Sequence, residues 1–203
     1  MKIALIGATG QVGSRIRAEA LQRGHQVSAI ARQANTIAPS AGLTPVALDV
    51  ADSGKLAAAL SGHDVAIVSV KYSVVDARPI LKAIEQAGVP RVLVVGGAGS
   101  LQVAPGLDLV DTPNFPAPYK EEALAAREIL RLLRAGTALD WSLVSPSALL
   151  QPGERTGKFR IGGDQLLVDA QGNSRISLED LALALVDELE SPKHSRQRFT
   201  VGY

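Results

Sequence analysis

The sequence predicts an α/β fold: a single domain with a doubly wound parallel sheet and helices on both of its faces. Three observations lead to this prediction. Short apolar runs alternate with helical patterns along most of the chain, and the first run leads into a glycine-rich turn. The length of 203 residues, with 46% hydrophobic content, suffices for one buried core but not for two domains of ordinary size. We therefore expect residues 1–203 to form one domain.

The first expected strand, residues 3–6, leads into the turn Gly7-Ala8-Thr9-Gly10-Gln11-Val12-Gly13, which has a glycine at every third position. Glycine permits tight backbone angles, close approach of the main chain to a pyrophosphate, and packing of the next helix on the sheet. Apolar residues recur at helical spacing behind the turn, and a second strand at 26–31 completes a β-turn-α-β unit. The residues that we expect to bind a dinucleotide here are Gly7, Thr9, Gly10, Gln11, Val12 and Gly13. The alternative is a turn with a purely structural role.

The apolar runs that follow predict the rest of the sheet. Further strands are expected at 44–48, 65–70, 89–95 and 141–145, with helices between them at 55–60, 78–87 and 121–135. These strands are apolar throughout, which is typical of a parallel sheet that helices cover on both faces. Right-handed crossovers then leave a crevice at the carboxyl ends of the strands, where we expect ligands to bind.

The pattern changes after the sixth strand, because prolines and repeated glycines interrupt it. We expect residues 146–176 to form an irregular substrate-side segment of loops, with room for a short hairpin. The final helix is predicted to start after Ser177, a good N-cap residue that has Asp180 three positions later. Residues 199–201 can add a last strand.

Composition excludes several classes of function. The formal net charge is +1, with 21 basic and 20 acidic residues spread along the chain, so neither nucleic acid nor an anionic membrane is an expected partner. The chain has no cysteine, and its three histidines lie far apart, so we expect no metal site. Its first residues do not resemble a signal peptide and no apolar run is long enough to span a membrane, which predicts a cytoplasmic protein.

Four blocks of the sequence resemble a known family. They are the glycine turn, Arg32 at the end of the second strand, Val94-Val95-Gly96-Gly97-Ala98-Gly99-Ser100-Leu101, and Ser145-Pro146-Ser147-Ala148 with residues 152–157. With these blocks the chain resembles, over essentially its whole length, the atypical short-chain dehydrogenase/reductases. The nearest branch is that of the small NADH-flavin reductases, related to flavin and biliverdin reductases. The resemblance implies an NAD(P)-binding Rossmann domain, with further cofactor contacts from Asp49 and Val50 beside the adenine, from Gly96, and from Pro146 beside the nicotinamide.

The end of the second strand predicts which dinucleotide is preferred. NAD-selective sites usually place an Asp or Glu there, which binds the ribose hydroxyls, whereas this strand ends Ile30-Ala31-Arg32 without an acid. A guanidinium can bond phosphate oxygens bidentately, so Arg32 predicts a preference for NADP(H), with NAD(H) possible. The alternatives are a solvated loop arginine at position 32 and, for Asp49, an ordinary cap of a helix that starts at Ala51.

The tyrosines do not fit the usual proton donor of short-chain dehydrogenases, a tyrosine whose pKa is lowered by a lysine four residues later. The fourth residue after Tyr72 is Asp76, the fourth after Tyr119 is Ala123, and Tyr203 ends the chain. An ordinary alcohol dehydrogenase or a sugar-nucleotide epimerase is therefore disfavoured. A flavin or a quinone takes hydride onto a conjugated ring that delocalises the resulting charge, so it can react without a strong protein acid.

Two hydroxyl residues are the candidates for orienting the acceptor. Ser100 stands where the resemblance implies a substrate-side serine, and Tyr119 lies at the start of the next helix. The alternatives are a turn or cap role for Ser100 and a capping aromatic role for Tyr119. In the irregular segment, Arg155 and Phe159 can belong to a lid over the acceptor, with Arg155 pairing with a carboxylate or phosphate, or to a surface loop.

The sequence and the resemblance together predict an NAD(P)H-dependent oxidoreductase that transfers hydride to a flavin, a quinone or a similar conjugated acceptor. Two alternatives stay open. One is a redox sensor that binds NADP(H) without turnover, and the other is a carbonyl reductase that uses Ser100 and Tyr119 without the lysine. The expected partner is a small-molecule acceptor, and a homodimer is possible.

Overall fold

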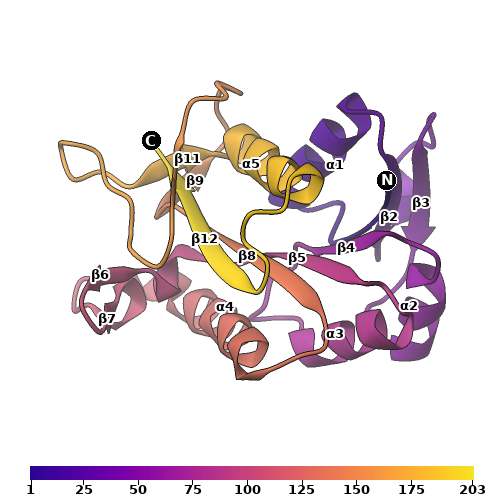
Figure 1. Ribbon diagram of the computed structural model, residues 1–203, viewed down its shortest axis with the longest axis horizontal. Coiled ribbons are helices and arrows are strands. Elements are labelled where there is room, and N and C mark those ends of the chain that lie inside the picture. Colours follow the sequence, from indigo (N-terminus) through magenta and orange to yellow (C-terminus); the bar gives the residue numbers. More distant parts are fainter.

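The computed structural model describes all 203 residues, and its centre is one eight-stranded sheet (Figure 1). The strands of this sheet are β1 (Lys2–Ile6), β2 (Gln26–Ala31), β3 (Leu43–Ala47), β4 (Val65–Val68), β5 (Arg91–Val95), β8 (Asp140–Pro146), β10 (Arg160–Gly162) and β12 (Gln197–Gly202). The helices are α1 (Gln11–Gln22), α2 (Ser53–Leu60), α3 (Ala77–Gln86), α4 (Ala117–Ala135) and α5 (Leu178–Glu190).

The strand order is β10-β12-β8-β5-β4-β1-β2-β3, and every neighbouring pair is parallel except β10 with β12. From β1 the chain builds outward to β3 on one side and to β12 on the other. The direction reverses between β1 and β4, and in doubly wound sheets such a switch point opens a crevice at the carboxyl ends of the strands. The predicted single α/β fold of the Rossmann type is confirmed.

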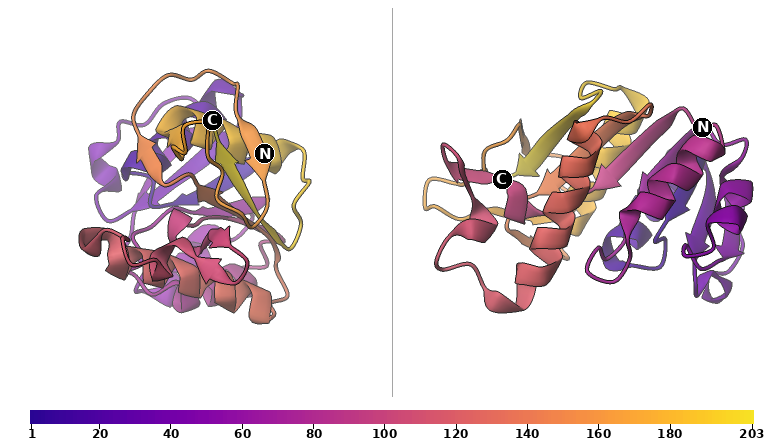
Figure 2. Two further views of the ribbon diagram at one scale, coloured as in Figure 1. Left: turned by 90° about the vertical axis from the view of Figure 1, so that its left-hand side faces the viewer. Right: turned by 90° about the horizontal axis from the view of Figure 1, so that it is seen from below.

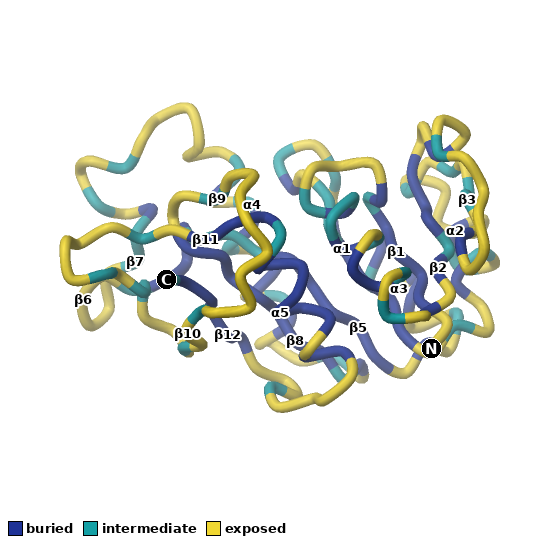
Figure 3. Tube along the Cα trace, turned by 90° about the horizontal axis from the view of Figure 1, so that it is seen from above, coloured by how far each residue is buried: buried dark blue, intermediate teal, exposed yellow.

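Two helical layers enclose the sheet. Helices α1 and α5 cover one face and α2, α3 and α4 cover the other (Figure 2). Alternate residues of β1 enter the two cores, since Ile3 and Leu5 face α1 while Ala4 and Ile6 face α2 and α3. The central strands are therefore buried along most of their length (Figure 3), which is why their sequences are apolar without alternation.

Several short elements differ from the prediction. Strands β6 (Gln102–Ala104) and β7 (Leu107–Asp108) form a small antiparallel pair between β5 and α4 that the sequence did not predict. In the substrate-side segment, β9 (Leu149–Gln151) pairs in parallel with β11 (Arg175–Ser177), and β10 joins the main sheet. Within the substrate-side segment, neither β9 with β10 nor β10 with β11 forms a hairpin. Strands of two or three residues are too short to show a period, so their partners are set by tertiary packing.

The N-terminus of α5 confirms Ser177 as a helix cap, because the backbone N–H of Asp180 donates to the Ser177 Oγ at 3.0 Å. The carboxylate of Asp180 is fully buried and has a different role. It accepts hydrogen bonds from the Thr156 Oγ1 at 2.5 Å, the Gly157 N–H at 2.9 Å and the Tyr203 hydroxyl at 2.8 Å. One carboxylate thus ties the substrate-side segment and the C-terminus to α5. None of the helices is both long enough and apolar enough to cross a membrane.

Candidate functional site

Each of the three glycines of the first turn is explained by a different feature of the structure. Gly7 has φ +87°, and a Cβ on it would lie 1.9 Å from the Ser69 carbonyl oxygen. A Cβ on Gly13 would lie 2.2 Å from the Gly7 carbonyl oxygen, so α1 packs directly on the turn. Gly10 is extended, with φ −69° and ψ 168°, and a Cβ there would meet only the Gly7 carbonyl oxygen at 3.4 Å. The close approach of a ligand is the remaining reason for a glycine at position 10.

The turn ends at the N-terminus of α1, where backbone N–H groups are free for a ligand. Gly10 is the N-cap residue, and no side chain caps the helix. The first backbone bond of the helix runs from the Ser14 N–H to the Gly10 carbonyl, so the amides of residues 11–13 have no partner within the helix. Thr9 and Gln11 are exposed, and the side chain of Val12 packs against the core. Open amides with the positive end of a helix dipole fit a pyrophosphate.

At the carboxyl ends of β2 and β3 lie Arg32, which was predicted to select the dinucleotide, and Asp49 and Val50, which were expected beside its adenine. Arg32 is exposed in the turn after β2, and no side chain of the protein pairs with it. Asp49 is exposed, and its Oδ1 accepts the Ala51 N–H at 3.0 Å. The suggestion that Asp49 caps the next helix is wrong, because α2 starts at Ser53 and Asp52 is its cap. Val50 is half-buried against the core beneath α2.

The loop after β4 lies beside the glycine turn. The sequence did not predict the contacts that hold this loop in place. Ser69 continues the pairing of β4 with β1, since its N–H donates to the Ile6 carbonyl at 2.9 Å. Tyr72 is buried and its hydroxyl donates to the Val95 carbonyl at 2.9 Å. Burial, together with the nearby charge of Glu122, raises the pKa of Tyr72 well above its usual value. This phenol is therefore not available as a proton donor to a substrate.

At the ends of β5 and β8 the predicted residues lie on adjacent strands. The Gly96 N–H donates to the Val144 carbonyl at 2.8 Å, and a Cβ on Gly96 would lie 2.7 Å from a methyl group of Leu143. Glycine at position 96 therefore allows this strand end to approach β8. Pro146 is buried as the last residue of β8, opposite Val201 of β12. The two predicted contacts, Gly96 and Pro146, thus lie at the edge of the crevice.

Ser100 and Tyr119 have different surroundings. Ser100 is buried, and the Arg198 Nη1 donates to both its Oγ and its carbonyl oxygen, at 3.2 and 3.1 Å. Ser100 and Arg198 line a hollow of about 520 Å³ beside α4, together with Arg127, Arg131 and Arg134. Tyr119 lies in the first turn of α4 with 68% of its surface exposed, and no hydrogen bond joins the two hydroxyls. A catalytic role for either residue stays a prediction.

Arg155 contacts a carboxylate of its own chain. Its Nε and Nη2 both lie 2.8 Å from the carboxylate oxygens of Glu19 on α1. The hydrogen bond from Arg155 is the largest influence that lowers the pKa of Glu19. Phe159 packs against the core between α1 and α5. The segment around Arg155 is thus fastened to α1. The Arg155 guanidinium pairs with Glu19 within the chain.

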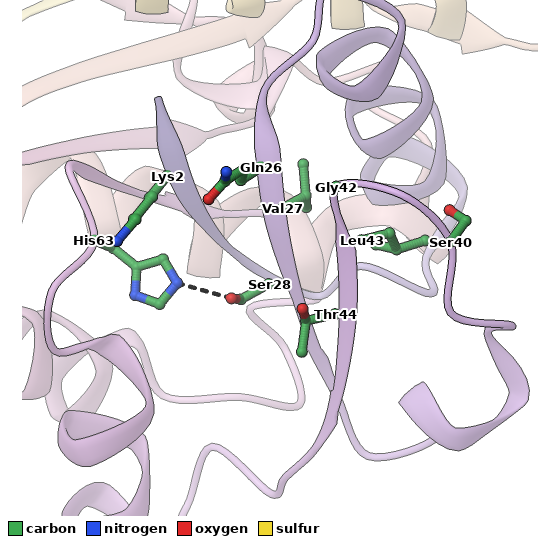
Figure 4. Close-up of a pocket in the computed structure, with 9 residues that line it drawn as sticks. All are labelled: Lys2, Gln26, Val27, Ser28, Ser40, Gly42, Leu43, Thr44 and His63. Carbon is green, nitrogen blue, oxygen red and sulfur yellow. Dashed lines mark hydrogen bonds between the residues drawn. The ribbon is translucent and has the colours of Figure 1, made fainter.

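A separate hollow of about 300 Å³ lies near the amino ends of β1, β2 and β3, away from the crevice (Figure 4). Its lining is mostly polar and includes His63, whose Nε2 lies 2.8 Å from the Ser28 Oγ (Figure 4). The Nδ1 of the same ring lies 3.0 Å from the Leu60 carbonyl oxygen. Since a carbonyl can only accept, Nδ1 carries a proton. Both ring nitrogens are satisfied within the chain, which fits a structural histidine.

The glycine turn and the open helix end agree with the comparison to known families. A family model described as NAD(P)H-binding matches residues 7–192. The chain belongs to this NAD(P)H-binding family.

Three of the similar solved structures illustrate the likeness, and each covers the whole of this chain. A protein of Burkholderia pseudomallei, described as a candidate exported protein, is 48% identical over 100% of both chains with a TM-score of 0.91. A candidate epimerase of Bacteroides thetaiotaomicron is 41% identical over 96% of its own length, with a TM-score of 0.95. A candidate NADH-flavin reductase of Streptococcus pneumoniae is 36% identical over 99% of its length, with a TM-score of 0.83.

These similarities confirm the resemblance to atypical short-chain dehydrogenase/reductases and to NADH-flavin reductases. They support binding of NAD(P)H but do not choose between NADPH and NADH. The predicted cytoplasmic location stays a prediction, since one of the similar proteins is described as exported.

Proposed function

We propose that the protein is an NAD(P)H-dependent reductase that transfers hydride to a flavin, a quinone or a similar conjugated acceptor. The observation that carries this proposal is the glycine turn at the switch point of the sheet. The amides at the start of α1 have no partner within the helix there, and a Cβ on Gly10 would meet only the Gly7 carbonyl oxygen. The family match supports the proposal that the cofactor is NAD(P)H. The candidate NADH-flavin reductase among the similar structures supports the proposal that the acceptor is a flavin or a related conjugated molecule.

Different residues of the crevice would bind different parts of the cofactor. The amides at the start of α1 would bind the pyrophosphate, and Arg32 would bind the 2′-phosphate that distinguishes NADPH from NADH. Gly96 and Pro146, at the carboxyl ends of β5 and β8, are the residues that would contact the nicotinamide. The bound cofactor supplies the hydride, and the protein orients the acceptor and excludes water from it.

The surroundings of the two tyrosines near the site, Tyr72 and Tyr119, support an acceptor that needs no strong acid from the protein. The Tyr72 hydroxyl is buried and already donates to the Val95 carbonyl, and burial raises its pKa. Tyr119 is exposed, but the residue one turn further along α4 is Ala123 and not a lysine. A conjugated ring spreads the negative charge that hydride transfer creates, so orientation by the site suffices.

The test combines cofactor binding with a panel of acceptors. Mass spectrometry of the purified protein identifies any retained dinucleotide, and FMN, riboflavin, quinones and aldehydes are then assayed with NADPH and with NADH. We expect oxidation of NADPH by a flavin or a quinone. Tight binding of NADPH without turnover of any acceptor would favour a redox sensor. Reduction of aldehydes alone, lost in Tyr119→Phe, would favour a carbonyl reductase.

A further inference from the structure

We propose that Glu122 and Tyr72 are positioning residues for the dinucleotide site, and that they act by holding the loop after β4 against the glycine turn. The proposal rests on the proposed function. Neither residue belongs to the glycine turn, and the contacts that link them to it run through backbone groups of residues 69–73.

Glu122 binds the loop through both of its carboxylate oxygens. Its Oε1 accepts the Tyr72 N–H at 2.9 Å, and its Oε2 accepts the Ser73 N–H at 2.8 Å. The residue comes from the second turn of α4, and its side chain is half-buried. Two hydrogen bonds from consecutive amides to one charged group define the position of a loop more closely than one neutral bond does.

Tyr72 fixes the same loop from the other side. Its hydroxyl donates to the Val95 carbonyl at the carboxyl end of β5, immediately before Gly96. The ring is buried in the core that α2, α3 and α4 cover. The backbone amides of the loop therefore fasten it to α4, through Glu122, which lies 50 residues from Tyr72 in the sequence. The side chain of Tyr72 fastens it to β5, through Val95, which lies 23 residues away.

The fastened loop contacts the glycine turn directly. The Ser69 carbonyl oxygen approaches Gly7 so closely that a Cβ on Gly7 would lie only 1.9 Å from it. The Ser69 N–H donates to the Ile6 carbonyl. The loop thus spans from Gly7 on one side of the crevice to the strand end that precedes Gly96 on the other. Any shift of this loop changes the space beside both predicted contacts of the dinucleotide.

The experiment compares Glu122→Gln and Tyr72→Phe with the wild type and with Glu121→Gln. Glu121 is the exposed neighbour of Glu122 on α4, so its variant removes the same charge without releasing the loop. Glutamine at 122 keeps the size of the side chain and one acceptor oxygen but loses the second. We expect about a tenfold weaker Kd for NADPH in Glu122→Gln, from the loss of one charge-assisted hydrogen bond, and a smaller weakening in Tyr72→Phe.

Two further readouts separate positioning from a general loss of stability. Binding is measured at a temperature where circular dichroism shows every variant to be folded, and the acceptor assay is analysed as a KM for NADPH and a kcat. Positioning predicts a higher KM with a kcat within about threefold of the wild type, because the loop shapes cofactor binding and not the hydride step. Hydrogen exchange should quicken at the amides of residues 72 and 73 in Glu122→Gln and stay unchanged in Glu121→Gln.

The outcomes distinguish this inference from the proposed function. Wild-type affinity for NADPH in both folded variants would overturn the positioning role and leave the reductase intact. An equal loss in Glu121→Gln would also overturn it, because the effect would then be due to net charge. If the wild type itself does not bind NADPH, the proposed function fails and the positioning role fails with it.

Discussion

Gly13 packs directly on Gly7: a Cβ on Gly13 would lie 2.2 Å from the Gly7 carbonyl oxygen. The turn is therefore closed at its two ends by contacts within the protein, and only its middle glycine has an open side. This arrangement separates substitutions that damage the fold from substitutions that damage ligand binding.

The Gly10→Val variant tests the open side of the turn. We expect it to fold and to bind NADPH at least about a hundredfold more weakly, because a branched side chain blocks the approach of the pyrophosphate to the backbone. Backbone strain contributes little, since Gly10 is extended. Titration calorimetry measures the affinity.

The contrast for Gly10→Val is Gly13→Ala, which should lower the melting temperature because even one carbon meets the Gly7 carbonyl. Gly163→Ala is the neutral control, since a Cβ there has no neighbour within 4 Å. Unchanged affinity in a folded Gly10→Val protein would mean that the turn has only a structural role.

The Arg32→Glu variant tests the choice of dinucleotide. The wild type should bind NADPH more tightly than NADH, and the variant should reverse this order, because an acid repels the 2′-phosphate and can bind the ribose hydroxyls. Losing the charge-assisted contact should cost about 1.5 to 3 kcal/mol, or roughly ten- to a hundredfold in the Kd for NADPH. Lys82→Glu, an exposed change on α3 with the same change of charge, is the matched control. If wild type and Arg32→Glu both favour NADH, Arg32 does not contact the cofactor.

The Tyr119→Phe variant tests whether the reaction needs a protein acid. We expect it to keep most of the activity with a flavin or quinone, because Tyr119 lacks the lysine one turn later that accompanies the usual proton donor. General acid catalysis is usually worth ~10² to 10⁴-fold in rate. A loss of that size with every active acceptor, at unchanged affinity for NADPH, would contradict hydride transfer without a protein acid.

The sheet and its helices were predictable because their signals are local. β3 was expected at 44–48 and lies at Leu43–Ala47, and α3 was expected at 78–87 and lies at Ala77–Gln86. The strand predictions depend on short continuous runs of apolar residues, and the helix predictions depend on apolar residues that recur at helical spacing. The turn at residues 7–13 was predictable for a similar reason, since it joins a strand to a helix within one short segment.

The contacts that shape the candidate site were not predictable from spacing. Glu122 binds amides 49 and 50 residues away, and Arg198 reaches Ser100 across 98 residues. A carboxylate that accepts backbone N–H groups of a distant segment has no sequence pattern, because any residue except proline can supply the amide. The sequence therefore singled out Ser100 without showing that a buried guanidinium binds its hydroxyl.

The Arg155→Ala variant tests the role of Arg155 as a fastening to α1. We expect a loss of about 1 to 2 kcal/mol in the free energy of unfolding, since Glu19 is buried and keeps only Arg23 as its partner. The Kd for NADPH and the KM for the acceptor should stay at wild-type values. Lys158→Ala, an exposed change in the same segment, is the control. A raised KM for an anionic acceptor, without loss of stability, would instead place Arg155 at the acceptor.

The pH dependence of stability should report the buried carboxylate of Glu188. It accepts hydrogen bonds from the Arg91 Nη2 at 3.0 Å, the Ser142 Oγ at 2.9 Å and the His194 Nδ1 at 2.7 Å. Burial, the largest single influence, raises its pKa, but the hydrogen bonds from His194, Lys193 and Ser142 together bring the pKa below the ordinary value of 4.5.

Because the folded pKa of Glu188 is lower than the unfolded one, its contribution to stability is present above about pH 4.5 and is lost as the pH falls through the folded pKa. Glu188→Gln removes the charge that Arg91 faces and should cost about 2 kcal/mol or more at pH 7. Urea unfolding from pH 7 down to pH 3 should then show a shallower decline in the variant than in the wild type. Glu128→Gln, which breaks only an exposed pair with Arg131, should follow the wild-type curve to within about 1 kcal/mol. Parallel curves for Glu188→Gln and the wild type would show that other carboxylates account for the loss of stability in acid.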